Sequence, residues 1–401
     1  MKPYKFLSCI CLMLASLVLY SQSPTDIVQI QKRTKVAELI QKSKAQKIET
    51  EKNLQKALRY ARLKNWPLVI KMQDGSTSTL IGITEDLKPM YARTLNGGAA
   101  ATSRADRLYS GGGLSLSVHG EGMKAGVWDD GRARPDHQLL SGKITVPYPA
   151  NNSTNTDHAT HVAGTIAGAD IVSNRLARGI AFEATIDDYW FGYDLSEMMI
   201  ASANGLLLSN HSYTGLNEIP YYTNRASIID DMAFDAPYYL PVFACGNSGH
   251  TSSYKVSGES ISKNVIAVGN VYEQRNYTSP SSIIAYSSSS AGPSSDFRVK
   301  PEICSKGVEV YSSNATTTSS YGLQWGTSAA APSITGTLLL LQQHYHNINS
   351  SFMLAATLKG LALHTADEAG SNPGPDIVFG WGLMNAEFAA NTITHNHKSA
   401  I

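Results

Sequence analysis

The sequence is poor in charge, in cysteine and in long apolar runs. Charged residues make up 16% of the 401 residues, and the formal net charge is +1, so no general attraction to nucleic acid or to anionic membranes is expected. Hydrophobic residues make up 42%, a share that suits a sizeable core and argues against a disordered chain. The composition therefore indicates a globular protein, and it does not name an activity.

Cysteine is scarce, with four residues in the whole chain. Cys9 and Cys11 lie in the first apolar run, which leaves Cys245 and Cys304 in the remainder. In an oxidising compartment these two residues can pair, but the sequence does not give their separation. A disulfide and a pair of buried free thiols therefore both stay open.

The longest apolar run stands at the beginning of the chain. It covers residues 6–20, follows Lys2 and Lys5, and precedes the small residue Ser21. This order is typical of a secretory signal peptide over residues 1–21, and it predicts a secreted protein, extracellular or periplasmic. The alternative is an uncleaved membrane anchor, although a full span needs about 20 apolar residues. No membrane association is expected after signal cleavage.

Two different patterns follow the predicted signal peptide. Residues 27–64 are rich in Gln, Lys, Glu, Ala and Leu, with apolar residues at helical spacing, which predicts a solvated amphipathic helix or a pair of helices. Residues 67–83 contain two β-rich runs on either side of Asp74-Gly75, which predicts a hairpin. The small and glycine-rich segments at residues 96–101 and 110–113 predict an exposed linker of the kind that proteases cut.

Beyond residue 115, short apolar runs alternate with helical segments. The runs KAGVWDD, LPVFACGN and NVIAVGNV predict strands. HVAGTIAG and SAAAPSITGTLLLLQQHY predict helices, the second with Pro332 in its first turn, where proline is tolerated. This alternation predicts a mainly parallel sheet with helices on both faces. In such a sheet the functional site lies beyond the carboxyl ends of the strands.

Four of these segments carry residues that suit serine-based catalysis. A serine nucleophile needs a base, a residue that orients the base, and donors for the oxyanion. Asp129 ends the strand in GVWDDG, and His158 begins the helix in DHATHVAGTIAG. Asn247 follows the strand in FACGNSG, and Ser328 begins the helix in GTSAAAPSITG. The backbone N–H of Ser328, at a helix N-terminus, is a second oxyanion donor.

Each segment also has a plainer interpretation when it is taken alone. The aspartates can cap the next element, Asn247 can be a turn residue, and Ser328 can be a helix N-cap. His158 and His161 have the spacing of a zinc pair, but the segment lacks the H-E-x-x-H pattern. We therefore assign no metal site.

Taken together, the segments resemble the conserved blocks of the subtilase family of serine proteases. The matching blocks of that family are Asp-Ser/Thr-Gly for Asp129–Gly131, His-Gly-Thr-His for His158–Gly164, Ala-Ala-Gly-Asn for Ala244–Asn247, and Gly-Thr-Ser-Met-Ala-Ala-Pro for Gly326–Pro332. The order Asp, His, Ser along the chain agrees with that of subtilisin. Three weaker matches are SNHSYTG to the substrate-pairing strand, VKPEICSKGVEVYSS to Lys-Pro-Asp-Ile-x-Ala-Pro-Gly, and FGWGLMNA to a closing block.

The resemblance implies a fold and a division of the chain. The expected fold is α/β, a subtilisin-like three-layer fold with a mainly parallel sheet between helices, preceded by a small α/β propeptide. The expected parts are a propeptide at residues 22–100, a catalytic domain at residues 115–392 and a tail at residues 393–401. The propeptide boundary lies somewhere in residues 92–116.

The resemblance also implies a secreted serine endopeptidase that acts through an acyl-enzyme on Ser328. Its triad is Asp129, His158 and Ser328, its oxyanion hole contains Asn247, and its substrate-binding residues are Ser212, Tyr213 and Gly215. The implied partners are protein or peptide substrates and the chain's own propeptide as an intramolecular inhibitor, with no nucleic acid. No cofactor is required; calcium often stiffens members of the family, but no loop here has a recognisable ligand spacing.

Four positions depart from the family blocks. Asp130, Ala159, Cys245 and Ala329 stand where the family has a small hydroxyl residue, glycine, alanine and methionine. None of these changes removes a member of the triad or an oxyanion donor. The alternative to an active peptidase is a catalytically impaired binding protein on the same scaffold. A lipase is not supported because no G-x-S-x-G motif is present.

Overall fold

The computed structural model describes residues 23–71, 77–94, 100–171, 177–215, 220–252 and 255–399. The predicted signal peptide lies outside these residues, as do Cys9 and Cys11. Within them, no helix combines the length and the apolar character needed to cross a membrane.

Seven strands form the central sheet, and every pairing between them is parallel. Their order across the sheet is β11-β10-β9-β7-β4-β6-β5. The strands are β4 (Lys124–Asp129), β5 (Ile144–Thr145), β6 (Thr185–Trp190), β7 (Leu208–His211), β9 (Leu240–Ala244), β10 (Ile266–Val271) and β11 (Ile303–Lys306). Nearly all residues of β4, β9 and β10 are buried, as expected for parallel strands covered on both faces.

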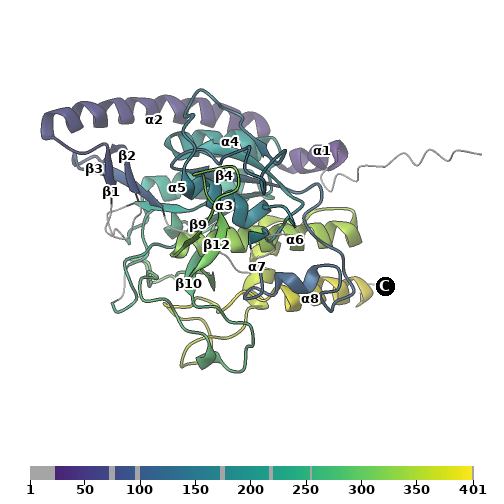
Figure 1. The fold of residues 1–401 in the computed structure, drawn as a ribbon. Helices are drawn as coiled ribbons and strands as arrows, with labels where there is room; N and C mark the ends of the chain where they lie inside the picture. The colour runs from purple at the N-terminus through teal and green to yellow at the C-terminus, as the bar shows by residue number, and fades with distance from the viewer. Residues whose placement is uncertain are drawn as a thin grey trace, which may run out of the picture.

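Helices cover both faces of this sheet (Figure 1). On one face, α3 (Asp157–Ala167) and α6 (Thr327–Asn349) enclose the main apolar core. On the other, α4 (Asp194–Ala203) and α5 (Asn224–Asp235) enclose a second core. Two further helices, α7 (Ala355–His364) and α8 (Ala386–Ser399), pack against α6. The predicted three-layer α/β fold with a mainly parallel sheet is therefore confirmed.

Strand β4 shows how the sheet separates the two cores. Val127 points into the core under α3 and α6, and Trp128 points into the core under α4 and α5. Because side chains alternate along a strand, Asp129 returns to the side of Val127 at the carboxyl edge of the sheet. The side of the sheet that carries α3 and α6 therefore also carries Asp129.

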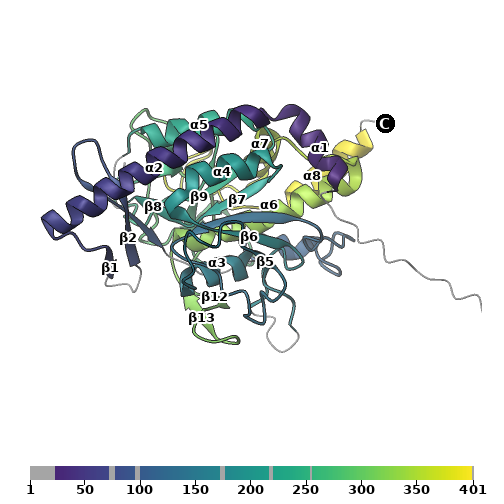
Figure 2. The ribbon, with the colours of Figure 1, turned by 90° about the horizontal axis from the view of Figure 1, so that it is seen from above.

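The described residues of the segment 23–94, called here the N-terminal unit, form a separate layer, and its helix α2 lies above α4 (Figure 1). The unit contains α1 (Pro24–Arg33), α2 (Val36–Lys64), β1 (Val69–Lys71), β2 (Thr77–Ile83) and β3 (Pro89–Thr94). Strands β1 and β2 pair antiparallel, which confirms the predicted hairpin, although its turn lies outside the described residues. Of the two alternatives for the helical segment, a single helix or a pair, the structure has the pair. Figure 2 shows α2 lying lengthwise over α4.

Helix α2 is buried at two places by different partners. Near its beginning, Leu39 lies in the core formed with α4 and α5, and Ser43 Oγ donates to the carbonyl of Ser196 at 2.5 Å. Near its end, Ala57 and Ala61 pack against strands β2 and β3. The helix therefore joins the small sheet of the N-terminal unit to the rest of the molecule.

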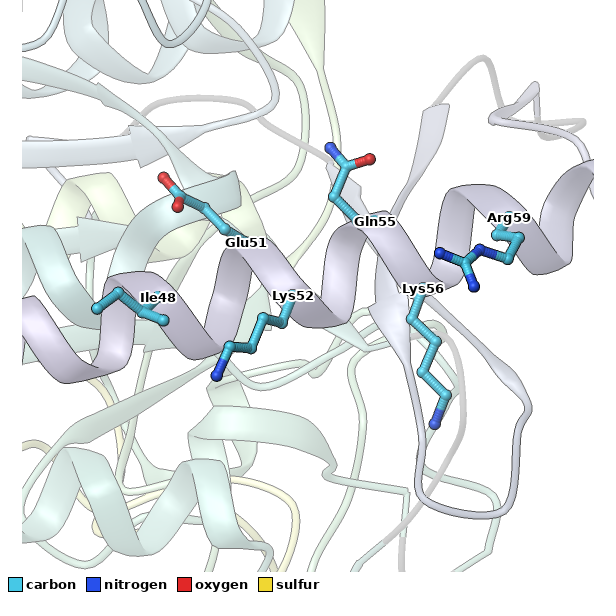
Figure 3. A pocket seen from close by; sticks show the side chains of 6 residues that line it. All are labelled: Ile48, Glu51, Lys52, Gln55, Lys56 and Arg59. Carbon is cyan, nitrogen blue, oxygen red and sulfur yellow. The ribbon is translucent and has the colours of Figure 1, made fainter.

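The opposite side of α2 faces solvent. A shallow pocket of about 430 Å³ runs along it, and Figure 3 shows the side chains that line it, Ile48, Glu51, Lys52, Gln55, Lys56 and Arg59. None of the candidate catalytic residues borders this pocket. Lys52 and Lys56 lie on the solvent-exposed face that the sequence predicts for this helix.

The segment after the N-terminal unit is only partly an exposed linker. Ser110, Gly111 and Gly113 are exposed as predicted. In contrast, Ala105 and Leu108 are fully buried in the main core. The chain from about residue 102 to residue 109 is thus part of the second, larger unit.

Cys245 and Cys304 are both buried free thiols. Cys245 follows β9 and Cys304 lies in β11, so the intervening strand β10 separates them. The disulfide alternative is therefore not realised.

Candidate active site

Asp129 is a fully buried carboxylate at the carboxyl end of β4. Its Oδ1 lies 2.5 Å from Nδ1 of His158 and also accepts the backbone N–H of Asp130 at 2.8 Å. Burial raises the pKa of Asp129 to about 6, and the neighbouring His158 opposes this shift. The carboxylate is therefore placed to orient an imidazole and to stabilise its cation.

His158 is the second residue of α3, and the start of this helix is fixed by Thr156. The Thr156 hydroxyl accepts the N–H of Ala159 at 3.2 Å and donates to Asp130 Oδ1 at 2.7 Å. Asp130 thus holds the helix cap beside the histidine. His158 itself is 7% exposed, so it is nearly buried but retains some contact with the surface.

His161 takes no part in a metal pair with His158. Its ring is fully buried, with Nε2 at 3.1 Å from the carbonyl of Val310. Burial lowers its pKa to about 3 because the charged form is desolvated. Among the described residues, one group has the proximity for a metal ion, Asp129, Asp130 and His158, and two of its members are hydrogen-bonded to each other.

Ser328 is the second residue of α6 and is 2% exposed. The residue before the helix, Gly326, has φ 129°, a conformation that favours glycine. The carbonyl of Ser328 accepts the hydroxyl of Ser212 at 2.5 Å. As an early residue of the helix, Ser328 has a backbone N–H without an acceptor inside the helix.

Asn247 follows β9 and is held against the beginning of α6. Its Oδ1 accepts the backbone N–H of Thr327 at 2.9 Å and lies 3.3 Å from the Thr327 hydroxyl. The same hydroxyl accepts the N–H of Gly246 at 3.2 Å. Because Oδ1 is engaged in this way, Nδ2 is the part of the amide that can donate to a ligand.

The register of the sheet brings these residues together. Strands β9, β7 and β4 are consecutive neighbours, and Trp128 pairs with His211. Asp129 and Ser212 therefore lie at the same level of adjacent strands, which are about 4.8 Å apart. Since Ser212 binds the Ser328 backbone, the acid and the serine both lie at the carboxyl edge that the sequence predicts for the site.

The predicted substrate-binding residues lie in and before the short strand β8 (Tyr213–Gly215). The side chains of Ser212 and Tyr213 are both buried, and the Tyr213 hydroxyl donates to Asp194 at 2.8 Å. The backbone of β8 pairs antiparallel with β3, with Thr94 opposite Tyr213 and Ala92 opposite Gly215. In the full chain, the N-terminal unit therefore occupies the free edge of this strand.

Two supporting residues were not identified from the sequence: Thr156 caps α3, and Thr327 holds Asn247. Ser212, which the resemblance places in substrate binding, also holds the Ser328 backbone. The TS dipeptide at Thr327 was visible as a motif, but its contact with Asn247 joins residues that are 80 positions apart.

Comparison with known proteins agrees with this arrangement. The subtilase family profile (peptidase S8) matches residues 120–382. The chain is 28% identical to Subtilisin DY of Bacillus licheniformis over 299 residues, covering 72% of this chain and 96% of that protein. It is 27% identical to Subtilisin BL of Lederbergia lenta, covering 67% of this chain and 91% of that protein. The match to M-protease of Shouchella clausii (strain KSM-K16) is 26% identical, over 67% of this chain and 64% of that protein. The chain belongs to the subtilase family.

Proposed function

We propose that the protein is a secreted serine endopeptidase with Asp129, His158 and Ser328 as its catalytic triad. The observation that carries the proposal is the 2.5 Å contact between Asp129 and His158, at the edge of the sheet where the first turn of α6 carries Ser328. Membership of the subtilase family supports a serine peptidase that acts on proteins or peptides. The signal-like residues 1–21 support secretion.

The mechanism follows from the position of each group. Ser328 attacks the carbonyl carbon of the scissile peptide bond while His158 accepts its proton, and Asp129 holds the resulting imidazolium. The oxyanion receives hydrogen bonds from Asn247 Nδ2 and from the backbone N–H of Ser328. His158 then protonates the leaving amine. Water, activated by the same histidine, hydrolyses the acyl-enzyme and restores Ser328.

The N-terminal unit is proposed to act as a propeptide and intramolecular inhibitor. Strand β3 pairs with β8, so it takes the backbone groups that an extended peptide substrate would use. A pocket of about 740 Å³, bordered by Asn53, Tyr91, Tyr213 and Arg225 among others, remains between the unit and the catalytic domain. An interface with such a gap suits a partner that is later released.

The test of the proposed function is labelling with a fluorophosphonate, which reacts with an activated serine. The expected result is one adduct per mature chain, on Ser328, identified by peptide mapping. A folded, processed chain that takes no label would instead favour the binding protein on a subtilase scaffold.

Removing the Asn247 side chain is expected to reduce turnover without preventing substrate binding. Asn247→Ala should lower kcat about 10²–10³-fold, as for the corresponding oxyanion donor in subtilisin, because the amide acts on charge that develops in the transition state. KM should change little. Steady-state kinetics on a chromogenic peptide would measure both parameters. Ser248→Ala, at the exposed neighbouring position, is the matched control, and an equal kcat for the two variants would exclude this role for Asn247.

The mature N-terminus is expected to lie after Thr94 and before Ser103. Thr94 still pairs with β8, whereas Ser103 accepts the backbone N–H of Ala386 at 2.9 Å and Arg104 forms an ion pair with Asp367. A cut further along would remove Leu108 from the core. N-terminal sequencing of the mature band tests this position, and a new terminus beyond Leu108 would contradict it.

A further inference from the structure

Two buried polar side chains, Asn270 and Ser305, lie at the ends of β10 and β11. Along β10, Ile266 and Val268 point into the core with α6, and Asn270 follows them on the same face. Along β11, Ile303 points into this core, and Ser305 follows it. Two apolar rows thus end in polar residues at the carboxyl edge of the sheet.

Asn270 and Ser305 face the same space. They are opposite each other in the parallel register of the two strands, so their side chains project on the same side of the sheet. Both are 0% exposed. Asn270 Oδ1, Asn270 Nδ2 and Ser305 Oγ have no hydrogen-bond partner within the described residues. Three buried polar atoms without partners are unusual, because buried donors and acceptors are normally satisfied.

The backbone beside these two side chains is hydrogen-bonded to the residue that precedes α6. A Cβ added to Gly307 would lie 2.6 Å from Asn270 Oδ1 and 2.2 Å from the carbonyl oxygen of Gly326. The N–H of Gly326 donates to the carbonyl of Gly307 at 2.8 Å. The Asn270 amide therefore lies beside the link between β11 and the residue that precedes the nucleophile helix.

The unpartnered atoms define the chemistry of the ligand. Asn270 Nδ2 can only donate, Asn270 Oδ1 can only accept, and Ser305 Oγ can do either. A cation would satisfy the two oxygens but would be repelled by the amide hydrogens. A water molecule both donates and accepts, and buried waters typically make two to four hydrogen bonds. The family segment that residues 300–307 resemble has alanine at the position of Ser305, so this polar pair is not part of the shared catalytic blocks.

We propose that Asn270 and Ser305 bind a buried water molecule that supports the Gly307–Gly326 link. Asn270 is then a positioning residue for Ser328, acting through the water and the turn rather than on substrate. The water site is independent of the proposed peptidase function, and only the effect on turnover rests on it.

A high-resolution crystal structure of the full chain tests the water site without any activity measurement. The expected result is an ordered water at about 2.7–3.2 Å from Asn270 and from Ser305 Oγ. A structure in which Asn270 and Ser305 bond directly to each other, or in which neither contacts water, would overturn the proposal.

A double-mutant cycle tests whether the two residues act through a shared ligand. Asn270→Ala and Ser305→Ala should each lower Tm, and the combined variant should lose less than the sum of the two losses. The control pairs Asn270→Ala with Ser202→Ala, a buried serine in α4 that binds the carbonyl of Met199; these losses should add. Additive losses for Asn270 and Ser305 as well would overturn the proposal.

The positioning role is tested by kinetics. Asn270→Ala should lower kcat about 10-fold with KM within about twofold, because a displaced nucleophile affects the transition state more than substrate binding. Ser202→Ala should leave kcat unchanged. An unchanged kcat for Asn270→Ala, with the wild type active, would reject the positioning role. An inactive wild type would instead count against the proposed peptidase function.

Discussion

Ser328→Ala is expected to lower peptide hydrolysis about 10⁶-fold, because the proposed nucleophile is lost. Residual hydrolysis above the uncatalysed rate would come from the oxyanion donors and from substrate binding, neither of which the substitution removes. The measurement is turnover of a chromogenic peptide at high enzyme concentration, after removal of contaminating proteases. Circular dichroism should show a folded variant, since Ser328 contributes its backbone to the Ser212 contact and its backbone is unchanged.

The same substitution should also stop maturation. If the N-terminal unit is removed by the chain's own active site, Ser328→Ala will stay as one chain that contains residues 23–94. Ser333→Ala is the matched control, because Ser333 is a buried serine of the same helix whose hydroxyl donates to the carbonyl of Ala329. That variant should mature and hydrolyse peptides normally. Hydrolysis by Ser328→Ala at the rate of Ser333→Ala would refute the assignment of the nucleophile.

The sequence predicted where the four candidate site residues lie because strand ends and helix starts can be recognised from short local patterns. Asp129 ends an apolar strand and Asn247 follows one, and His158 and Ser328 are each the second residue of a helix that starts with small residues. Parallel strands bring their carboxyl ends to a common edge. The general location of the candidate site could therefore be derived from motifs and alternation alone, and the structure places all four residues near that edge.

The contacts that hold the site could not be derived in this way. Thr327 holds Asn247 from 80 positions away, and Ser212 reaches Ser328 across 116 positions. Such contacts depend on strand order and register, which local propensity does not determine. The same holds for Asp130. The sequence shows that it is a second carboxylate next to Asp129, but it does not show that the Thr156 hydroxyl donates to Asp130.

The elements of the N-terminal unit were predicted more accurately than the segment that follows it. The helices and the hairpin have clear periodic patterns, and both are present. The small and glycine-rich segments at residues 96–101 and 110–113 predicted an exposed linker, yet Ala105 and Leu108 between them are buried. Pairing of β3 with β8 could not be predicted either, because it joins strands about 120 residues apart, and nothing in Ala92–Thr94 identifies Tyr213–Gly215 as the partner.

Asp129→Asn should lower kcat about 10⁴-fold while leaving the fold intact. The asparagine Nδ2 would donate to His158 Nδ1 at the place where the carboxylate now accepts. The proton of the neutral imidazole would then sit on Nε2, where it prevents the histidine from accepting the Ser328 proton. Asp136→Asn, an exposed carboxylate that pairs with Arg134, is the control and should retain full activity. A loss smaller than about 10-fold would show that Asp129 does not orient the base.

The pH dependence of the wild type should show the same carboxylate by an independent route. Burial raises the pKa of Asp129 from 3.8 to about 6, and its Oδ1 lies 2.5 Å from Nδ1 of His158. The two groups titrate as a pair, so kcat/KM should fall as the pH decreases through about 6 and the Asp129–His158 pair takes up a proton. The contribution of Asp129 to stability changes with pH in the opposite direction to kcat/KM. Between pH 6 and 3.8 the folded chain holds a proton at Asp129 that the unfolded chain releases, so this group favours folding more as the pH falls.

Activity and the contribution of Asp129 to Tm should therefore change in opposite directions across this window, and Asp129→Asn should remove the stability component because asparagine does not titrate. If the difference in Tm between the wild type and Asp129→Asn is the same at pH 4.5 and pH 7.5, Asp129 does not have the raised pKa on which this prediction depends.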